Sequence, residues 1–183
     1  QFRDAGRGPI ASHQYASRRV RRPKDPEFAH PVIAECLEYP LIEDNEDNFI
    51  LTREKSDEAE LYNPWYTVDL YNSFKVSRFF IEKLTQSDDP RLPVLVQTNE
   101  NGEYKGFPNG LTDQSLGQFI WADHSDPAEV FVSKSTPQFI MTASEVWFLR
   151  SEAALFGLSS GNADALYQKG IQLNMEMWGV PDP

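Results

Sequence analysis

The sequence predicts an all-α fold of antiparallel helix pairs with long irregular loops, and the last third of the chain gives the strongest observations for it. Thr142 and Glu145 form a Thr-x-x-Glu capping box, which marks the start of a helix that Gly157 can end in a left-handed conformation. Asn162 can cap a second helix, which ends at Gly179. Because only a short link separates the two helices, we expect them to form an antiparallel hairpin.

Each helix of this hairpin carries residues at helical spacing that we expect to form its buried face. The predicted buried residues are Val146, Leu149, Ala153 and Phe156 in the first helix and Tyr167, Ile171, Asn174 and Trp178 in the second. Ala153, Ala154 and Gly170 are small enough for the two backbones to approach closely. One pair of an αα-repeat leaves its other face to be covered by neighbouring pairs. We therefore expect this chain to dimerise or to pack against a further part of a longer protein.

The preceding part of the chain predicts shorter elements joined by turns. In order, these are a helix over 31–38, a polar segment rich in turns over 43–67, an amphipathic helix over 70–84, a short strand or extended run over 92–97, and a loop over 111–136. The loop contains one aromatic cluster, Phe119-Ile120-Trp121. A helical body with long loops is the expected result.

The net charge of −11 is unevenly distributed along the chain. Residues 1–24 carry seven basic side chains and one acidic side chain, Asp4, which gives a charge of +6. Residues 25–183 therefore carry −17, and the two parts sum to −11. We interpret residues 1–24 as a basic arm that is either disordered or an artefact of cloning or reading frame, and residues 25–183 as part of one helical domain. No nucleic-acid-binding fold accompanies the arm, and the acidic body repels a polyanion, so we exclude nucleic acid as a partner.

No pattern in the sequence indicates an enzyme, a metal site or a cofactor. A Walker loop and a Gly-x-Ser-x-Gly elbow are both missing, and the carboxylates show no glycosidase-like pairing. His13, His30 and His124 lack metal-ligand spacing and are expected at the surface. Cys36, the only cysteine, is expected to be buried in a helix. The sequence contains neither a membrane-spanning stretch nor a signal peptide, and a mature fragment of an exported protein would also lack the latter.

Large aromatic residues in two predicted loops are candidates for ligand binding. Trp65 and Tyr66 follow Asn63, and Trp121 lies close to Asp123. Sugar rings present apolar C–H faces that can stack on Trp and Tyr, while Asn and Asp can form hydrogen bonds with the hydroxyl groups. The alternative is that these aromatic residues are buried anchors that pin their loops to the body. The two other tryptophans follow helical spacing and are expected in the core.

Three separated motifs resemble the C-terminal region of the SusD/RagB family, in that family's order. They are Asp89-Pro90-Arg91-Leu92-Pro93-Val94, Gly106-Phe107-Pro108-Asn109-Gly110-Leu111, and Met141-Thr142-Ala143-Ser144-Glu145-Val146 with Leu149-Arg150-Ser151-Glu152-Ala153-Ala154. The similarity extends from residue 35 to residue 181 and is greatest to the SusD-like type 2 branch. The chain departs from the family in residues 1–24 and at Ala143-Ser144, where the family usually has an aromatic and then a small residue.

The resemblance implies a tetratricopeptide-like helical fold with irregular binding loops, and a non-catalytic function. Such proteins are lipid-anchored at the surface of the outer membrane, bind an oligosaccharide or another nutrient, and deliver it to a SusC-like, TonB-dependent transporter. The family fixes no ligand residue by motif, so we expect the matched motifs to be structural. We expect the chain to be a fragment whose lipid anchor lies outside it. The alternative is an αα-repeat module that binds a peptide or protein partner.

Overall fold

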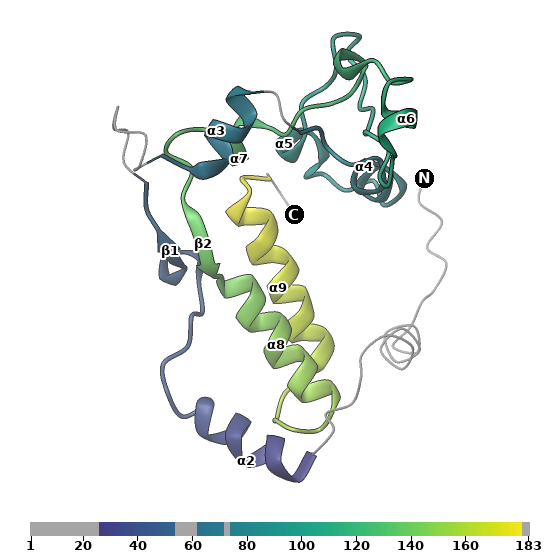
Figure 1. The fold of residues 1–183 in the computed structure, drawn as a ribbon. Coiled ribbons are helices and arrows are strands. Elements are labelled where there is room, and N and C mark those ends of the chain that lie inside the picture. Colours follow the sequence, from purple (N-terminus) through teal and green to yellow (C-terminus); the bar gives the residue numbers. More distant parts are fainter. Residues whose placement is uncertain (1–25, 54–61, 72–73, 181–183) are drawn as a thin grey trace. The chain divides into compact units, whose positions relative to one another are not determined.

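A computed structural model describes residues 26–53, 62–71 and 74–180 of the chain (Figure 1). Its elements are α2 (Pro26–Cys36), η1 (Asn45–Asp47), β1 (Phe49–Leu51), α3 (Pro64–Leu70), α4 (Arg78–Gln86), α5 (Leu92–Leu95), α6 (Asp113–Leu116), η3 (Trp121–Asp123), α7 (Glu129–Val132), β2 (Gln138–Met141), α8 (Ala143–Leu155) and α9 (Ala163–Met177). The fold is mostly helical, as predicted. The basic arm predicted over residues 1–24 lies outside the described residues.

The described residues form two compact units, which are treated separately below. The first comprises residues 26–47 and 143–173, and the second comprises the described residues of 48–142 and 174–183. Within the described ranges, none of the helices combines the length and hydrophobicity needed to cross a lipid bilayer.

The first unit is built on the predicted helical hairpin, in which α8 and α9 lie side by side (Figure 1). At Gly157 (φ 70°) α8 ends in a Schellman motif, in which the Leu158 N–H donates to the Ala153 carbonyl at 2.9 Å. Asn162 Oδ1 accepts a hydrogen bond of 3.0 Å from the Ala165 N–H at the start of α9. The predicted stop of α8 and the predicted cap of α9 are therefore confirmed.

Small residues bring the two helices of the hairpin together. A Cβ atom on the buried Gly170 would lie only 2.6 Å from Phe148 Cε1, so the ring of α8 packs directly against the backbone of α9. Ser151 Oγ also donates a hydrogen bond of 2.7 Å to the Ala163 carbonyl. The close approach predicted from the small residues is confirmed at Gly170.

The predicted buried face of the hairpin is wrong at Leu149 and Tyr167 and is only partly buried at most of the other positions. Leu149 and Tyr167 are each 52% exposed, and among the predicted residues only Ala153 is buried. The buried positions are Ala143, Ser144, Ser151 and Ala153 in α8 and Gly170 and Leu173 in α9. Apolar residues occupy most of the circumference of α8, so helical spacing could not select one face. Cys36, predicted to be buried, is also exposed.

The second unit contains a short sheet and a small hydrophobic core. β1 and β2 pair antiparallel with Ile50 opposite Phe139, and the register shifts between Phe49 and Ile50. The buried core residues are Ile81 and Leu84 of α4 with Leu95 and Val96, and the partly buried residues packed against them are Val76, Leu92, Val94, Phe131 and Trp178. The amphipathic α4 thus presents its apolar side to α5 and the residues around it.

The single helix predicted over residues 70–84 is wrong, because α3 ends at Leu70 and α4 begins at Arg78. Residue 76 is instead held by two backbone hydrogen bonds to distant segments: its N–H donates to the Ser125 carbonyl at 3.0 Å, and its carbonyl accepts from the Phe107 N–H at 2.8 Å. These tertiary hydrogen bonds override the helical spacing of the segment. The extended run predicted over 92–97 is also mostly helical, as α5.

The first family motif has a structural role in this unit. Asp89 Oδ1 accepts hydrogen bonds of 2.9 Å from both the N–H and the Nε of Arg91, and Oδ2 accepts from Arg91 Nη2 at 2.6 Å. Arg91 Nη1 reaches Asn174 Oδ1 at 2.5 Å. The hydrogen bonds from Arg91 hold the pKa of the Asp89 carboxyl below its ordinary value of 3.8, although burial acts in the opposite direction.

Acid should therefore weaken this part of the structure. Because the folded-state pKa of Asp89 is depressed, its stabilising contribution is present above the ordinary carboxyl pKa of 3.8 and is lost as the pH falls through the lower folded value. Asp89→Asn should lower the free energy of unfolding by about 1–2 kcal/mol at neutral pH. Urea titrations of both proteins should show this difference shrinking in acid; a difference that does not depend on pH would contradict the assignment.

Candidate functional site

A cavity of about 460 Å³ lies among the loops of the second unit. It is lined by Lys75, Thr98, Asn99, Glu100, Trp121, Ala122, His124 and Asp126. Trp121 is one of the residues predicted to bind a ligand, and it lies in η3 with Asp123, the polar residue predicted beside it. The cavity and this predicted pair therefore belong to the same loop region.

Trp121 packs against a cluster of aromatic side chains. The Trp121 ring packs 5.0 Å from the ring of Phe107, which also contacts Phe119 at 5.7 Å and His124 at 4.8 Å. His124 is only 4% exposed, and its Nδ1 lies 2.8 Å from the Ile120 carbonyl, so its prediction as a surface residue is wrong. Trp121 itself remains half-buried. The cluster leaves part of the indole accessible while the rest is held in place.

Buried polar side chains fix the loops around the cavity. The Asn99 amide donates to the Asp123 carbonyl at 2.8 Å and accepts from the Asn101 and Glu103 N–H groups at 3.0 and 2.9 Å. Ser125, which is fully buried, accepts a hydrogen bond of 3.0 Å from the Lys105 N–H. These bonds connect two loops that are distant in sequence, so the cavity wall is pre-organised.

An ion pair forms one side of the cavity. Lys75 Nζ lies 2.6 and 2.8 Å from the two carboxylate oxygens of Asp126 and 5.8 Å from the centre of the Trp121 ring. The Lys75 side chain is only 4% exposed, whereas that of Asp126 is 38% exposed. Burial raises the pKa of the Asp69 carboxyl, repulsion from Asp126 raises it further, and Lys75 opposes both effects. Asp69, Lys75 and Asp126 therefore form one electrostatic group.

The other predicted group lies at the start of α3. The Asn63 amide is 4% exposed: it donates to the Phe131 and Ser133 carbonyls at 2.7 and 3.1 Å and accepts from the Trp65 N–H at 3.2 Å as the helix cap. Trp65 is 55% exposed and Tyr66 is half-buried. Asn63 thus holds the chain in place, and the two aromatic residues are the members of this group that a ligand could reach.

Among the described residues, no ring contact connects Trp65 or Tyr66 with Trp121. Among the described residues, Trp65 contacts the ring of Phe74 at 5.8 Å, and Tyr66 contacts Tyr62 at 5.6 Å. Lys134 lies over the Tyr62 ring at 4.5 Å. This aromatic group is separate from the cluster around Trp121.

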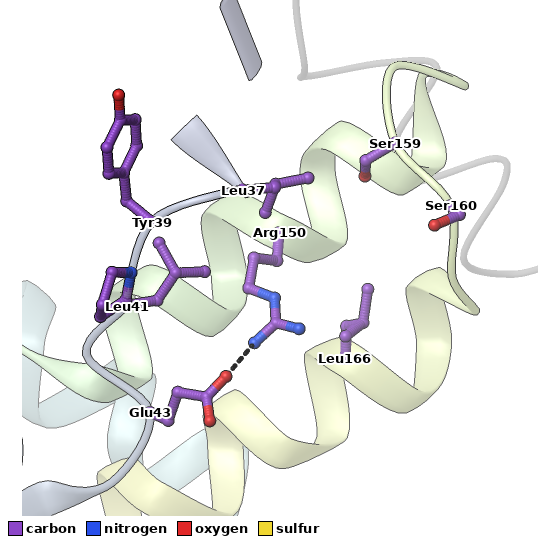
Figure 2. Close-up of a pocket in the computed structure, with 9 residues that line it drawn as sticks. Leu37, Tyr39, Leu41, Glu43, Arg150, Ser159, Ser160 and Leu166 are labelled. Atoms are coloured by element: carbon purple, nitrogen blue, oxygen red, sulfur yellow. Dashed lines mark hydrogen bonds and ion pairs between the residues drawn. The ribbon is translucent and has the colours of Figure 1, made fainter. Parts of the chain in front are cut away.

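A second cavity, of about 450 Å³, lies in the first unit (Figure 2). Its lining residues are Leu37, Tyr39, Pro40, Leu41, Glu43, Arg150, Ser159, Ser160 and Leu166. The Arg150 guanidinium stacks 4.0 Å from the centre of the Trp147 ring and lies 3.5 Å from Glu43 Oε1, while Trp147 Nε1 donates to the Glu43 carbonyl at 2.8 Å. Figure 2 shows the Tyr39 ring pointing away from Arg150. These contacts hold residue 43 against α8, and none of the predicted site residues lines this cavity.

The cavity beside Trp121 suits a ligand with both an apolar face and hydroxyl groups. The indole offers a flat apolar surface, and Thr98, Glu100 and Asp126 offer polar groups around it. Within the described part of the chain, no three His, Cys, Asp or Glu side chains gather as a metal site. Sequence reasoning missed Lys75, Asn99 and Asp126, because their roles depend on loops that only the folded chain brings together.

Comparisons with known proteins agree with the resemblance seen in the motifs. A family model for SusD-like type 2 proteins, described as "Starch-binding associating with outer membrane", matches residues 21–183. A SusD homologue from Bacteroides vulgatus is 25% identical with a TM-score of 0.74, and the match covers 86% of this chain and 32% of that one. A comparison with curated proteins finds no match.

Two further solved structures give the same result. A SusD-like protein from Bacteroides thetaiotaomicron is 25% identical with a TM-score of 0.70, and the match covers 85% of this chain and 32% of that one. A chitin-binding protein shares the fold at 21% identity and a TM-score of 0.70, over 85% of this chain and 36% of that one. The chain therefore spans about a third of the length of these proteins. It belongs to the SusD-like family, whose description associates it with starch binding and the outer membrane.

Proposed function

We propose that this chain is part of a non-catalytic, lipid-anchored protein of the outer-membrane surface that binds a glycan or another nutrient. The bound nutrient is delivered to a SusC-like, TonB-dependent transporter. The glycan site is the cavity beside Trp121 and Asp123, and Trp65 and Tyr66 on α3 form a second contact surface. The family description and the chitin-binding protein of the same fold support a carbohydrate ligand.

One observation carries this proposal: a half-buried indole lies in the wall of a polar cavity whose loops are fixed by buried hydrogen bonds. A pre-organised wall spares the ligand the free-energy cost of ordering the loops. The Trp121 indole can stack on the C–H face of a sugar ring, and Asp126, Glu100 and Thr98 can accept hydrogen bonds from its hydroxyl groups.

Truncation of the indole tests the site. Trp121→Ala should weaken oligosaccharide binding roughly tenfold, since an aromatic contact of this kind contributes on the order of 1–2 kcal/mol. Trp65→Ala tests the second surface in the same way. Calorimetric titration with maltohexaose and chitohexaose measures the affinities, and a thermal melt of each variant checks its folding.

The choice of control follows from the packing of Trp121. Because Trp121 packs on Phe107, Trp121→Phe should preserve most of the stability while reducing the stacking surface. Trp147→Phe, in the first unit, should leave the affinity unchanged. Equal affinity of the parent chain, Trp121→Ala and Trp65→Ala would place the glycan site outside these loops.

An exposed apolar groove in the first unit favours the alternative function, the binding of a protein partner. The groove measures about 520 Å³ and is lined by Ile33, Cys36, Leu37, Val146, Leu149, Arg150, Glu152, Ala153, Phe156 and Leu158. Exposed apolar surface of this kind promotes association.

We expect the isolated chain to dimerise, as measured by light scattering after gel filtration. Leu149→Glu should abolish the dimer, and a monomeric parent chain would contradict this expectation.

A further inference from the structure

The charges around the Trp121 cavity are unbalanced. In the described part of the chain, the carboxylates of Glu100 and Asp126 line the cavity, and that of Asp123 lies in the same loop as Trp121. The basic side chains are Lys75, which lines the cavity, and Lys105, whose Nζ is 3.7 Å from Asp123 Oδ2. Both lysines are therefore already paired with a carboxylate.

Lys75 is poorly placed to attract an anion. Both carboxylate oxygens of Asp126 lie within 2.8 Å of its Nζ, and its side chain is 4% exposed. Asp126, at 38%, is the more exposed partner of the pair. A ligand in the cavity thus meets the carboxylate of the ion pair rather than its ammonium group. The carboxylates of Glu100 and Asp126 at the wall only accept hydrogen bonds, so they suit hydroxyl donors.

The pKa of Asp69 indicates how Asp126 affects a second carboxylate. Its pKa is raised, first because burial disfavours the carboxylate and next because Asp126 repels it; the attraction of Lys75 is the weakest of the three effects. A carboxylate or sulfate on a ligand placed beside the partly exposed carboxylate of Asp126 would likewise be repelled by it. Residues 25–183 carry a net charge of −17, and the whole chain carries −11. This negative charge also repels an anionic ligand, at longer range.

We propose that the Trp121 cavity selects uncharged glycans and excludes acidic ones, such as those bearing uronate or sulfate groups. This inference rests on the proposed function, because it names the class of glycan for the same site. Glu100 is the specificity residue most open to test, because it is exposed and lines the cavity, and no ion pair found in the described residues includes it. Asp126→Asn is a poorer test, because it would leave Lys75 buried without its partner.

The experiment compares ligands with the same sugar chain, with and without carboxylates at C6. Maltohexaose, chitohexaose and the forms of each oxidised to carboxylate at C6 are titrated into the chain by calorimetry, at low and at high salt. We expect the oxidised forms to bind roughly tenfold more weakly at low salt, because like charges placed together disfavour binding. Salt should narrow this gap, since it screens the repulsion.

Glu100→Gln should reduce the difference in affinity between the neutral and oxidised ligands at low salt. Glu35→Gln on α2 changes the net charge by the same amount and should leave this difference unchanged. Oxidised ligands that bind as tightly as the neutral ones would overturn the selectivity and leave the proposed function standing. If no neutral hexasaccharide binds, both proposals fail.

Discussion

Leu173→Ala should lower the free energy of unfolding by about 2–5 kcal/mol, as expected for a large-to-small change in a core. Leu173 is 2% exposed and is one of the largest fully buried side chains among the described residues. Its carbonyl also accepts a hydrogen bond of 3.0 Å from Asn45 Nδ2, which attaches the segment around η1 to α9. Loss of this buried side chain should therefore leave a cavity where α9 packs. Urea denaturation followed by circular dichroism measures the change.

Leu149→Ala is the matched control for this prediction. Leu149 is the same residue type in the same hairpin, but it is 52% exposed, so the change should cost well under half of the Leu173→Ala effect in the monomer. Helical spacing alone predicted the opposite, since it assigned Leu149 to the buried face. Equal costs, or a larger cost for Leu149→Ala, would show that the face assigned from the structure is wrong.

Gly106→Ala should destabilise the second unit by about 3 kcal/mol or more, at the upper end of the range for overpacking. A Cβ atom at residue 106 would overlap Arg78 Cα and lie 2.5 Å from Arg78 N and 2.8 Å from the Ser77 carbonyl carbon. These are backbone atoms at the start of α4, so they cannot rotate away as a side chain could. The close approach exists because the Phe107 carbonyl accepts a hydrogen bond of 2.8 Å from the Arg78 N–H.

Gly117→Ala provides the comparison for this substitution. Gly117 is exposed at the end of α6 with φ of −63°, and a Cβ atom there would meet nothing within 4 Å. It should therefore change stability by less than about 0.5 kcal/mol. Guanidinium titrations of both variants distinguish the two positions. A mild effect of Gly106→Ala would mean that the segment carrying the second family motif is not packed as described.

The ends of the hairpin helices could be predicted because their signals are local. Gly157 and Gly179 both adopt a positive φ, 70° and 69°, and each ends its helix with the hydrogen bonds of a Schellman motif. Asn162 caps α9 through its own side chain. Such features depend on a few neighbouring residues, so the sequence determines them.

Features that depend on distant residues could not be predicted. Val76 lies inside the helix predicted over residues 70–84, but its backbone forms hydrogen bonds with Ser125 and Phe107, about 50 and 30 residues further along the chain. Lys75 carries no motif, and its partner Asp126 lies about 50 residues further along the chain. The buried face of α8 could not be predicted either, because Ser144 and Ser151 are buried, whereas polar residues are usually exposed.

One of the residues predicted to bind a ligand, Trp121, lines the cavity described above. The sequence singled out Trp121 as a large aromatic residue in a loop, and the structure assigns it to a cavity wall. Asn63 illustrates the limit of the same reasoning: a polar residue beside two aromatic residues suggested a ligand, but its amide is occupied by the chain itself. Proximity in sequence therefore could not show that the Asn63 amide is occupied by the chain itself.

The most direct test of the glycan site is to follow the indole N–H signals of the four tryptophans by NMR during titration with maltohexaose or chitohexaose. Each signal is assigned by a single Trp→Phe substitution. The Trp121 signal should shift and saturate with the calorimetric affinity, while the signal of Trp147, whose N–H is bound to the Glu43 carbonyl, should stay in place. A glycan that binds while the Trp121 signal remains unchanged would contradict the assignment of the site.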